Sequence, residues 1–292
     1  MFAAIDIGSN TVQLMIAETD NEKILRSWSW LKTTRLGSGT EQWLHAEPIA
    51  HTAAAVQEFM QIIAEHGVTQ TRIVATSAVR DAKNSEELLT AIATAAPTAP
   101  QVEILRGKEE ARISYTGACA ALSLTESVPV IDLGGSSAEL IYPEKKELRY
   151  LSGNIGAVRA HQNHWSRQEI YRRVQDFYPV LPHLSQVIGV GGTITTVAGV
   201  LRKLTSFQRQ EIEGVSLSRA DLEGLVESLE PLSISERCQY SPLLECRGEI
   251  IVEGLYIWLA LLDHIGFTEV LVTGGGILDG TIIEMLRNHQ EV

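Results

Sequence analysis

A phrase of nine residues occurs twice in this chain, and the distance between its copies limits the folds that the chain can adopt. The copies read DIGSNTVQL at Asp6–Leu14 and DLGGSSAEL at Asp132–Leu140. They lie about one domain length apart, which is too far for a solenoid repeat and instead indicates two related domains. We expect a first domain at 1–120, a second at 121–277, a boundary near 117–125, and a last helix, 278–292, that packs back on the first domain.

Apolar β-branched runs alternate with amphipathic stretches, which is typical of a layered α/β fold. The predicted strands are 2–7, 12–18, 24–30, 72–76, 101–105, 128–133, 137–142, 147–152, 186–190 and 269–273. The predicted helices are 47–67, 85–96, 108–124, 166–176, one that Ser218 and Asp221 open, an apolar one at 250–266, and 278–292. Asn84 with Glu87 is expected to form a capping box at the start of helix 85–96.

The composition and net charge limit the classes of partner that the chain can bind. The chain has 292 residues, 45% of them hydrophobic, and a formal net charge of −12. This charge disfavours nucleic acid and anionic membranes as partners, so a polyanionic ligand needs a local pocket or a metal ion. The three cysteines lack a metal-binding spacing, and the chain begins with a predicted strand in place of a signal peptide. We therefore expect a cytoplasmic protein with a reduced set of thiols.

The two copies of the repeat have the residues of phosphate-binding turns. Each places an aspartate at the end of a strand, Asp6 and Asp132, before a turn rich in glycine and small polar residues. Such turns present backbone N–H and hydroxyl groups to phosphate oxygens, and a carboxylate beside them can orient Mg²⁺. The predicted phosphate-binding residues are Gly8, Ser9, Asn10 and Thr11 in the first copy and Gly134, Gly135, Ser136 and Ser137 in the second, with Gly192 and Thr193 in GVGGT.

Five segments together resemble the exopolyphosphatase and guanosine pentaphosphate phosphohydrolase (Ppx/GppA) family of the actin-like ATPase superfamily. They are AAIDIGSNTVQLMI, ATSAVRDAKN, GKEEARISYTGA, VIDLGGSSAELI and GVGGTITTVAGV, and they follow the family's order over most of the chain. The resemblance implies an α/β fold of two actin-like, ribonuclease H-like domains, with mixed sheets flanked by helices and an active site in the interdomain cleft.

The resemblance also implies an activity: Mg²⁺-dependent removal of a terminal phosphate from inorganic polyphosphate or guanosine pentaphosphate. Glu110 is implied as the catalytic base, Arg80 as a ligand of the phosphate chain, and Asp6, Asp132 and Glu139 as metal-site residues. From the residues alone, other roles stay open. Arg80 is expected on a loop, where without the family motif its default role is a solvated pair with Asp81 or Glu87. Glu139 suits a cross-strand pair on an exposed face, and Thr193 suits a helix N-cap.

Some residues depart from the family pattern. Ser136 replaces a glycine, Ala138 a threonine and Gln13 an arginine, which affects the expected substrate preference and rate more than the reaction type. The helical domains of longer members are not expected here, so the channel for long polyphosphate is either reduced or completed by a homodimer. The alternatives are a kinase or ATPase of the same superfamily, and a non-catalytic regulator that binds guanosine tetra- or pentaphosphate.

Overall fold

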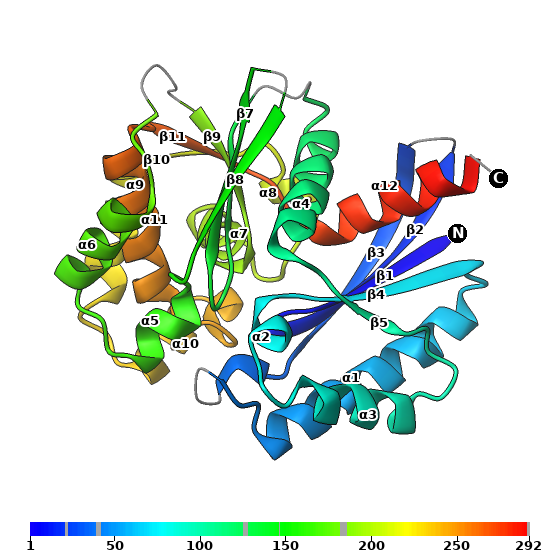
Figure 1. Cartoon of the computed structure of the whole chain (residues 1–292). Coiled ribbons are helices and arrows are strands. Elements are labelled where there is room, and N and C mark those ends of the chain that lie inside the picture. Colours follow the sequence, from blue (N-terminus) through cyan, green and yellow to red (C-terminus); the bar gives the residue numbers. More distant parts are fainter. Residues whose placement is uncertain (21–22, 39–41, 125–127, 146, 182–185, 291–292) are drawn as a thin grey trace. The chain divides into compact units, whose positions relative to one another are not determined.

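The computed structural model describes residues 1–20, 23–38, 42–124, 128–145, 147–181 and 186–290. The chain divides into two compact units (Figure 1). Unit 1 comprises Met1–Gly117 and Ile277–Val292, and unit 2 comprises Ala118–Gly276. Unit 1 is therefore built from two separate segments of the chain, whereas unit 2 is continuous. The predicted boundary 117–125 and the predicted helix 278–292 each include residues outside the described part.

Unit 1 contains a five-stranded mixed sheet in the order β3-β2-β1-β4-β5. Its strands are β1 (Phe2–Ile7), β2 (Thr11–Asp20), β3 (Lys23–Thr33), β4 (Gln70–Ala75) and β5 (Val102–Ile104). The first three form an antiparallel meander, and β4 and β5 continue the sheet parallel to β1. Every residue of β1 is buried, because helices cover both faces of the sheet at this central strand.

The helices of unit 1 form two layers around this sheet. They are η1 (Leu36–Ser38), α1 (Ala46–Glu65), α2 (Ser77–Arg80), α3 (Ser85–Ala95), α4 (Gly107–Ala121) and α12 (Ile277–Gln290). The end of α4, from Ala118 on, belongs to unit 2. Figure 1 shows α1 and α3 on one face of the sheet and α12 on the other. Successive side chains of β1 point to opposite faces, so Ile5 packs in the cluster with α1 and α3, and Ala4 packs against Ile282 of α12.

Unit 2 repeats the strand scheme with a six-stranded sheet in the order β10-β11-β9-β6-β7-β8. Its strands are β6 (Val130–Leu133), β7 (Ala138–Glu144), β8 (Glu147–Gly153), β9 (Gln186–Val190), β10 (Ser216–Ser218) and β11 (Glu269–Val272). Here too an antiparallel meander comes first, and β9 and β11 then add in parallel beside β6. The repeated phrase therefore marks the first hairpin of each unit.

The core of unit 2 forms around the apolar helix that the sequence predicts. The helices are α5 (Ala157–Gln162), α6 (Arg167–Phe177), α7 (Gly192–Leu201), α8 (Arg209–Ile212), α9 (Arg219–Leu229), α10 (Ile234–Tyr240), η2 (Pro242–Leu244) and α11 (Ile251–Ile265). Trp258 and Leu259 of α11 are fully buried in the main cluster. Among the described helices, none combines the length and apolarity that crossing a membrane requires.

Two predicted helix starts have different outcomes. The Ser218 and Asp221 capping box at α9 is present. The capping box at Asn84 is wrong, because the Asn84 side chain makes no cap hydrogen bond to α3. Its Oδ1 instead accepts from the backbone N–H of Leu44 at 2.8 Å, and its Nδ2 donates to the Leu44 carbonyl at 3.0 Å. Asn84 therefore fixes the segment before α1.

Candidate active site

The first copy of the repeat forms a four-residue turn between β1 and β2. Ile7 pairs with Val12, and the Gly8 N–H donates to the Thr11 carbonyl at 3.0 Å. A Cβ atom on Gly8 would lie 3.2 Å from that carbonyl oxygen, so the turn fits glycine best. Gly8, Ser9, Asn10 and Thr11 thus form one tight hairpin turn, as their sequence predicts.

The second copy closes in the same way in unit 2. Leu133 pairs with Ala138, and the Gly134 N–H donates to the Ser137 carbonyl at 3.0 Å. This turn holds Gly134, Gly135, Ser136 and Ser137. The repeat in sequence is therefore also a repeat in backbone geometry.

Each turn is held through a backbone carbonyl by the segment that follows the third strand of its meander, β3 in unit 1 and β8 in unit 2. The Asn10 carbonyl accepts from the N–H groups of Thr34 and Arg35, both at 3.0 Å, and the Gly135 carbonyl accepts from the Arg159 N–H at 3.0 Å. Within the described residues, nothing accepts from the backbone N–H of Asn10 or Gly135, or from the buried Nδ2 of Asn10. Donors of this kind suit the oxygens of an anion.

The predicted metal-site carboxylates lie beside these turns. Asp6 is buried near the end of β1 and lies opposite Gln13. Asp132 lies directly opposite Glu139 across β6 and β7, and Glu139 accepts a hydrogen bond from the Ser152 hydroxyl at 2.8 Å. Glu139 is thus a cross-strand partner, but it is buried, so the exposed-face alternative is wrong.

Two adjacent carboxylates are a donor set that Mg²⁺ accepts, since this ion is commonly held by one or two carboxylates together with substrate phosphates and waters. Over the part of the chain that is described, there is no group of three or more His, Cys, Asp or Glu residues able to hold a metal ion. The adjacent carboxylates of Asp132 and Glu139 therefore fit a metal ion that substrate oxygens help to hold.

Arg80 and Glu110 lie together in unit 1. Arg80 is the last residue of the single-turn helix α2, so the prediction that it lies on a loop is wrong. Its Nη1 donates to Glu110 Oε2 at 2.5 Å and to the Leu105 carbonyl at 3.1 Å. Its Nε also lies 3.6 Å from Asp81 Oδ1, so the expected pairing with Asp81 is present beside a pairing with Glu110 that sequence reasoning missed.

The two glutamates at the start of α4 point in different directions, as their spacing of about 100° requires. Glu110 contacts Arg80, and its side chain is only 12% exposed. Glu109 instead lines a separate pocket on the other flank of the helix. Of this pair, Glu110 therefore has the protected position that a catalytic base needs.

The Gly-rich segment before α7 lies close to the second turn. Gly191 has φ of 100°, and a Cβ atom there would overlap the Leu133 carbonyl oxygen and lie 3.3 Å from Asp132 Oδ1. Gly191 is also the N-cap residue, so the N-cap alternative for Thr193 is wrong. Thr193 is buried in the first turn of α7 against Gly254 of α11.

Arg247 is a candidate that sequence reasoning missed. Its guanidinium lies over Gly192, where a Cβ atom would overlap it. No ion pair or hydrogen bond of this guanidinium is found within the described residues. Burial lowers the pKa of Arg247, because the charged form loses solvation. The only sequence signal is the glycine at Gly192, which leaves space for a neighbouring side chain.

Unit 1 thus contains Asp6, the first turn, Arg80 and Glu110, and unit 2 contains Asp132, the second turn, Glu139, Gly192, Thr193 and Arg247. The model of the Ppx/GppA phosphatase family matches residues 15–289. The chain belongs to this family. Its enzymatic activity is therefore the hydrolysis of phosphoanhydride bonds, as the sequence predicts.

Relatives and solved structures of the Ppx/GppA family agree with this assignment. The chain is 27% identical to "Exopolyphosphatase 2" of Mycobacterium tuberculosis, over 97% of this chain and 98% of the relative. It is 23% identical to "Guanosine-5'-triphosphate,3'-diphosphate pyrophosphatase" of Photobacterium profundum, over 99% of this chain and 60% of the relative. The Aquifex aeolicus PPX-GPPA enzyme is similar with a TM-score of 0.77 and 26% identity, over 97% of this chain and 98% of that one. The actin-like fold of two mixed sheets flanked by helices is thereby confirmed.

Proposed function

We propose that this Ppx/GppA phosphatase removes the terminal phosphate of inorganic polyphosphate or of a guanosine pentaphosphate by in-line attack of water. The pairing of Glu110 with Arg80, in the unit that contains the first phosphate-type turn, is the observation that carries the proposal. It brings a carboxylate for a water proton next to a cation for a phosphate oxygen. The names of the two relatives support both substrates and do not rank them.

The reaction forms one P–O bond to the attacking water and breaks the bridging P–O bond of the anhydride. Glu110 accepts the proton that water loses, and the anhydride oxygen leaves with the remaining phosphate chain. An arriving phosphate competes with Glu110 for Arg80. We expect substrate binding to move the guanidinium toward phosphate and to leave the carboxylate available to water.

The residues of the turns bind and orient the substrate. The N–H groups of Asn10 and Gly135 donate to phosphate oxygens, and Arg247 supplies a positive charge next to Gly192. Asp132 and Glu139, with Asp6, are the residues that would hold Mg²⁺. When bound, this ion neutralises phosphate charge and orients the phosphate for attack. The sharing of one active site by both units stays a prediction.

Phosphate release tests the proposal directly. Long-chain polyphosphate, tripolyphosphate and guanosine pentaphosphate are each incubated with the wild type, Glu110→Gln and Glu109→Gln, with Mg²⁺ or with EDTA. We expect Mg²⁺-dependent release that Glu110→Gln lowers at least about a hundredfold, because it removes the general base. Glu109→Gln is the matched control. Its rate of phosphate release should stay within about twofold of the wild-type rate, since Glu109 faces another side of α4 and is not the proposed base.

Two results would contradict the proposal. Equal losses in both variants would show that Glu110 has no special role. No release from any substrate, together with tight binding of guanosine tetraphosphate in calorimetry, would favour the non-catalytic regulator.

A further inference from the structure

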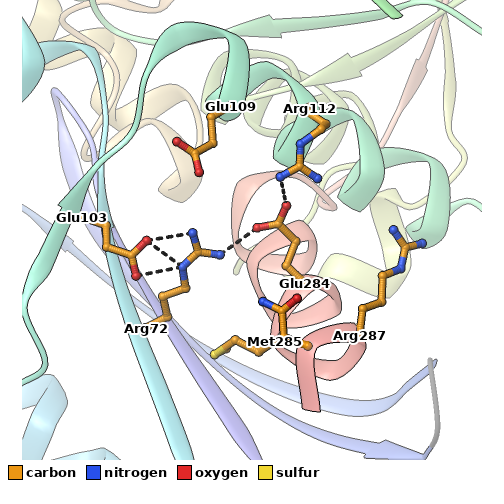
Figure 2. Close-up of a pocket in the computed structure, with 8 residues that line it drawn as sticks. Arg72, Glu103, Glu109, Arg112, Glu284, Met285 and Arg287 are labelled. Carbon is orange, nitrogen blue, oxygen red and sulfur yellow. Dashed lines mark hydrogen bonds and ion pairs between the residues drawn. The ribbon is translucent and has the colours of Figure 1, made fainter. Parts of the chain in front are cut away.

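A hollow of about 620 Å³ lies beside the first turns of α4 (Figure 2). It is lined by Arg72, Glu103, Glu109, Arg112, Glu284, Met285, Arg287 and Asn288. Six of these eight residues are charged, and they come from β4, β5, α4 and α12. On this flank α4 therefore faces open space and polar groups, whereas Ile113 is buried on another side of the helix.

A chain of ion pairs crosses the wall of this hollow. Glu284 of α12 accepts from Arg72 of β4 at 2.7 Å through one carboxylate oxygen and from Arg112 of α4 through the other. Arg72 also donates to Glu103 at 2.8 and 3.0 Å. The Glu284 side chain is 11% exposed, so it lies between the two arginines with little access to water. Figure 2 shows it at this central place.

The pKa of Arg72 reflects this arrangement. Burial lowers it, but the hydrogen bonds to Glu103 and Glu284 outweigh burial and raise the pKa above its ordinary value. Arg72 therefore stays positively charged between the carboxylates of Glu103 and Glu284.

A second contact fixes the same two helices one turn away. Gly280 of α12 lies so close to α4 that a Cβ atom there would overlap the Ile113 carbonyl oxygen. Gly280 and Glu284 are four residues apart and so lie on one face of α12. The close approach at Gly280 fixes the separation of the helices, and the Glu284 pair with Arg112 fixes the rotation of α4 about its axis.

We propose that Glu284 is a positioning residue for Glu110. Arg112 and Glu110 are two residues apart and project about 200° from each other around α4. Holding Arg112 toward α12 therefore directs Glu110 to the opposite side of the helix, where Arg80 lies. This inference rests on the proposed function, in which Glu110 accepts the water proton.

Glu284→Gln tests the proposal, because glutamine keeps the shape of the side chain and weakens both charge-assisted hydrogen bonds. The matched control is Glu103→Gln, which removes a carboxylate from the same Arg72 without contact to α4. We expect Glu284→Gln to lower kcat about tenfold with KM within about twofold, because misplacing a catalytic group lowers the rate more than it lowers binding. Glu103→Gln should keep wild-type kcat.

Hydrogen exchange of the α4 amides gives a readout that does not depend on activity. We expect exchange at residues 109–116 to be faster in Glu284→Gln than in the wild type and unchanged in Glu103→Gln. The melting temperature of both variants should stay within about 3 °C of the wild type, because partly exposed ion pairs contribute little stability.

The experiments distinguish a failure of the proposed function from a failure of the positioning role of Glu284. If the wild type releases no phosphate, the proposed function is wrong, and the exchange experiment alone decides whether Glu284 holds α4. Unchanged exchange in Glu284→Gln would overturn the positioning role. So would wild-type kcat in this variant, a change in KM alone, or an equal loss of kcat in Glu103→Gln.

Discussion

Arg247 combines a cost to folding with a proposed benefit to binding. A positive charge that is partly removed from water and has no partner in the described chain destabilises the fold. We expect Arg247→Met to raise the free energy of unfolding by about 1 kcal/mol, since it removes the desolvated charge and keeps an unbranched side chain over Gly192. We also expect it to raise KM for phosphate substrates about tenfold, because it removes a cation that binds them.

Both predictions are measured on the same Arg247→Met sample. Denaturant unfolding gives the change in unfolding free energy, and phosphate release gives the change in KM. Arg202→Met, at an exposed arginine that pairs with Glu211, is the control and should change neither quantity appreciably. Lower stability together with unchanged KM would show that Arg247 is a structural residue.

Gly191 is a position where the backbone accepts only glycine. It has φ of 100° and ψ of 162°, and a Cβ atom would overlap the Leu133 carbonyl. Gly191→Ala should therefore lower stability by about 3 kcal/mol or more. Gly266→Ala is the comparison, because Gly266 also has φ of 100° but no atom within 4 Å of its Cβ position. It should cost only about 1 kcal/mol, and equal losses in thermal unfolding would contradict the contact argument.

The sequence predicts a site residue well when its signal is local. The turns at Gly8 and Gly134 were predictable, because a short strand, a glycine and small polar residues specify a hairpin without reference to the rest of the chain. The Arg80 pair with Glu110 and the place of Arg247 over Gly192 depend on segments that are distant in sequence. Composition and periodicity contain no information on such contacts.

At the scale of elements, α6, α9 and α11 are joined by an ionic cluster. Arg167 of α6 donates to both carboxylate oxygens of Glu223 of α9, at 2.7 Å each. Arg219 of α9 and Tyr171 of α6 donate to Asp263 of α11 at 2.6 and 3.0 Å. The bidentate pair with Arg167 is the main cause that holds the pKa of Glu223 below its ordinary value.

The lowered pKa of Glu223 sets the direction of its pH dependence. Its stabilisation is complete above the unfolded-state pKa, near 4.5, and is lost as the pH falls through the lower folded-state pKa. Glu223→Gln should therefore lower the unfolding free energy by about 0.5–1 kcal/mol at pH 7, reduced by solvent screening, and should weaken the acid dependence below about pH 4.5. Thermal melts at pH 7 and pH 3 measure both effects.

Glu227→Gln, at an exposed glutamate one turn further along α9, is the matched control. It should leave the wild-type pH dependence unchanged. If its melting curve shifts with pH as that of Glu223→Gln does, the effect belongs to the general charge of the helix and not to the pair with Arg167.

The longest helices were predicted from their periodicity, whereas several of the shortest elements were not predicted. The amphipathic helix α1 and the apolar helix α11 extend over several turns, so their periodicity is clear. The helices α2 and α8 have four residues each, and β10 has three, and none of them was predicted, because so few residues show no clear period. The strand β5 is also short, but it was predicted at 101–105. Asn84 shows a further limit, because the same side chain suits a helix cap and a tertiary contact equally well.

At the scale of the whole molecule, the two units have separate apolar cores, and α12 completes only one of them. Ile282 is fully buried against Phe2, Ala4 and Met15 of unit 1. We expect Ile282→Ala to destabilise unit 1 by about 3 kcal/mol through the cavity it leaves. Hydrogen exchange should then increase in β1 and β2 while β6, β7 and α11 keep their wild-type protection.

Arg287→Ala, at an exposed residue of the same helix, is the control and should change exchange in neither unit. Equal loss of protection in β1 and β6 after Ile282→Ala would show that the two units unfold together. The experiment therefore shows whether the two units unfold independently of each other.

The two-segment construction of unit 1 has a consequence for the order of events on the ribosome. The strands β1 to β5 are synthesised first, but the face that carries Phe2 and Met15 stays uncovered until residues 277–290 have been made. Unit 2 is continuous, so its own segment is complete before that point. We therefore expect unit 2 to reach its finished state before unit 1, against the usual N-terminal-first order of folding during synthesis.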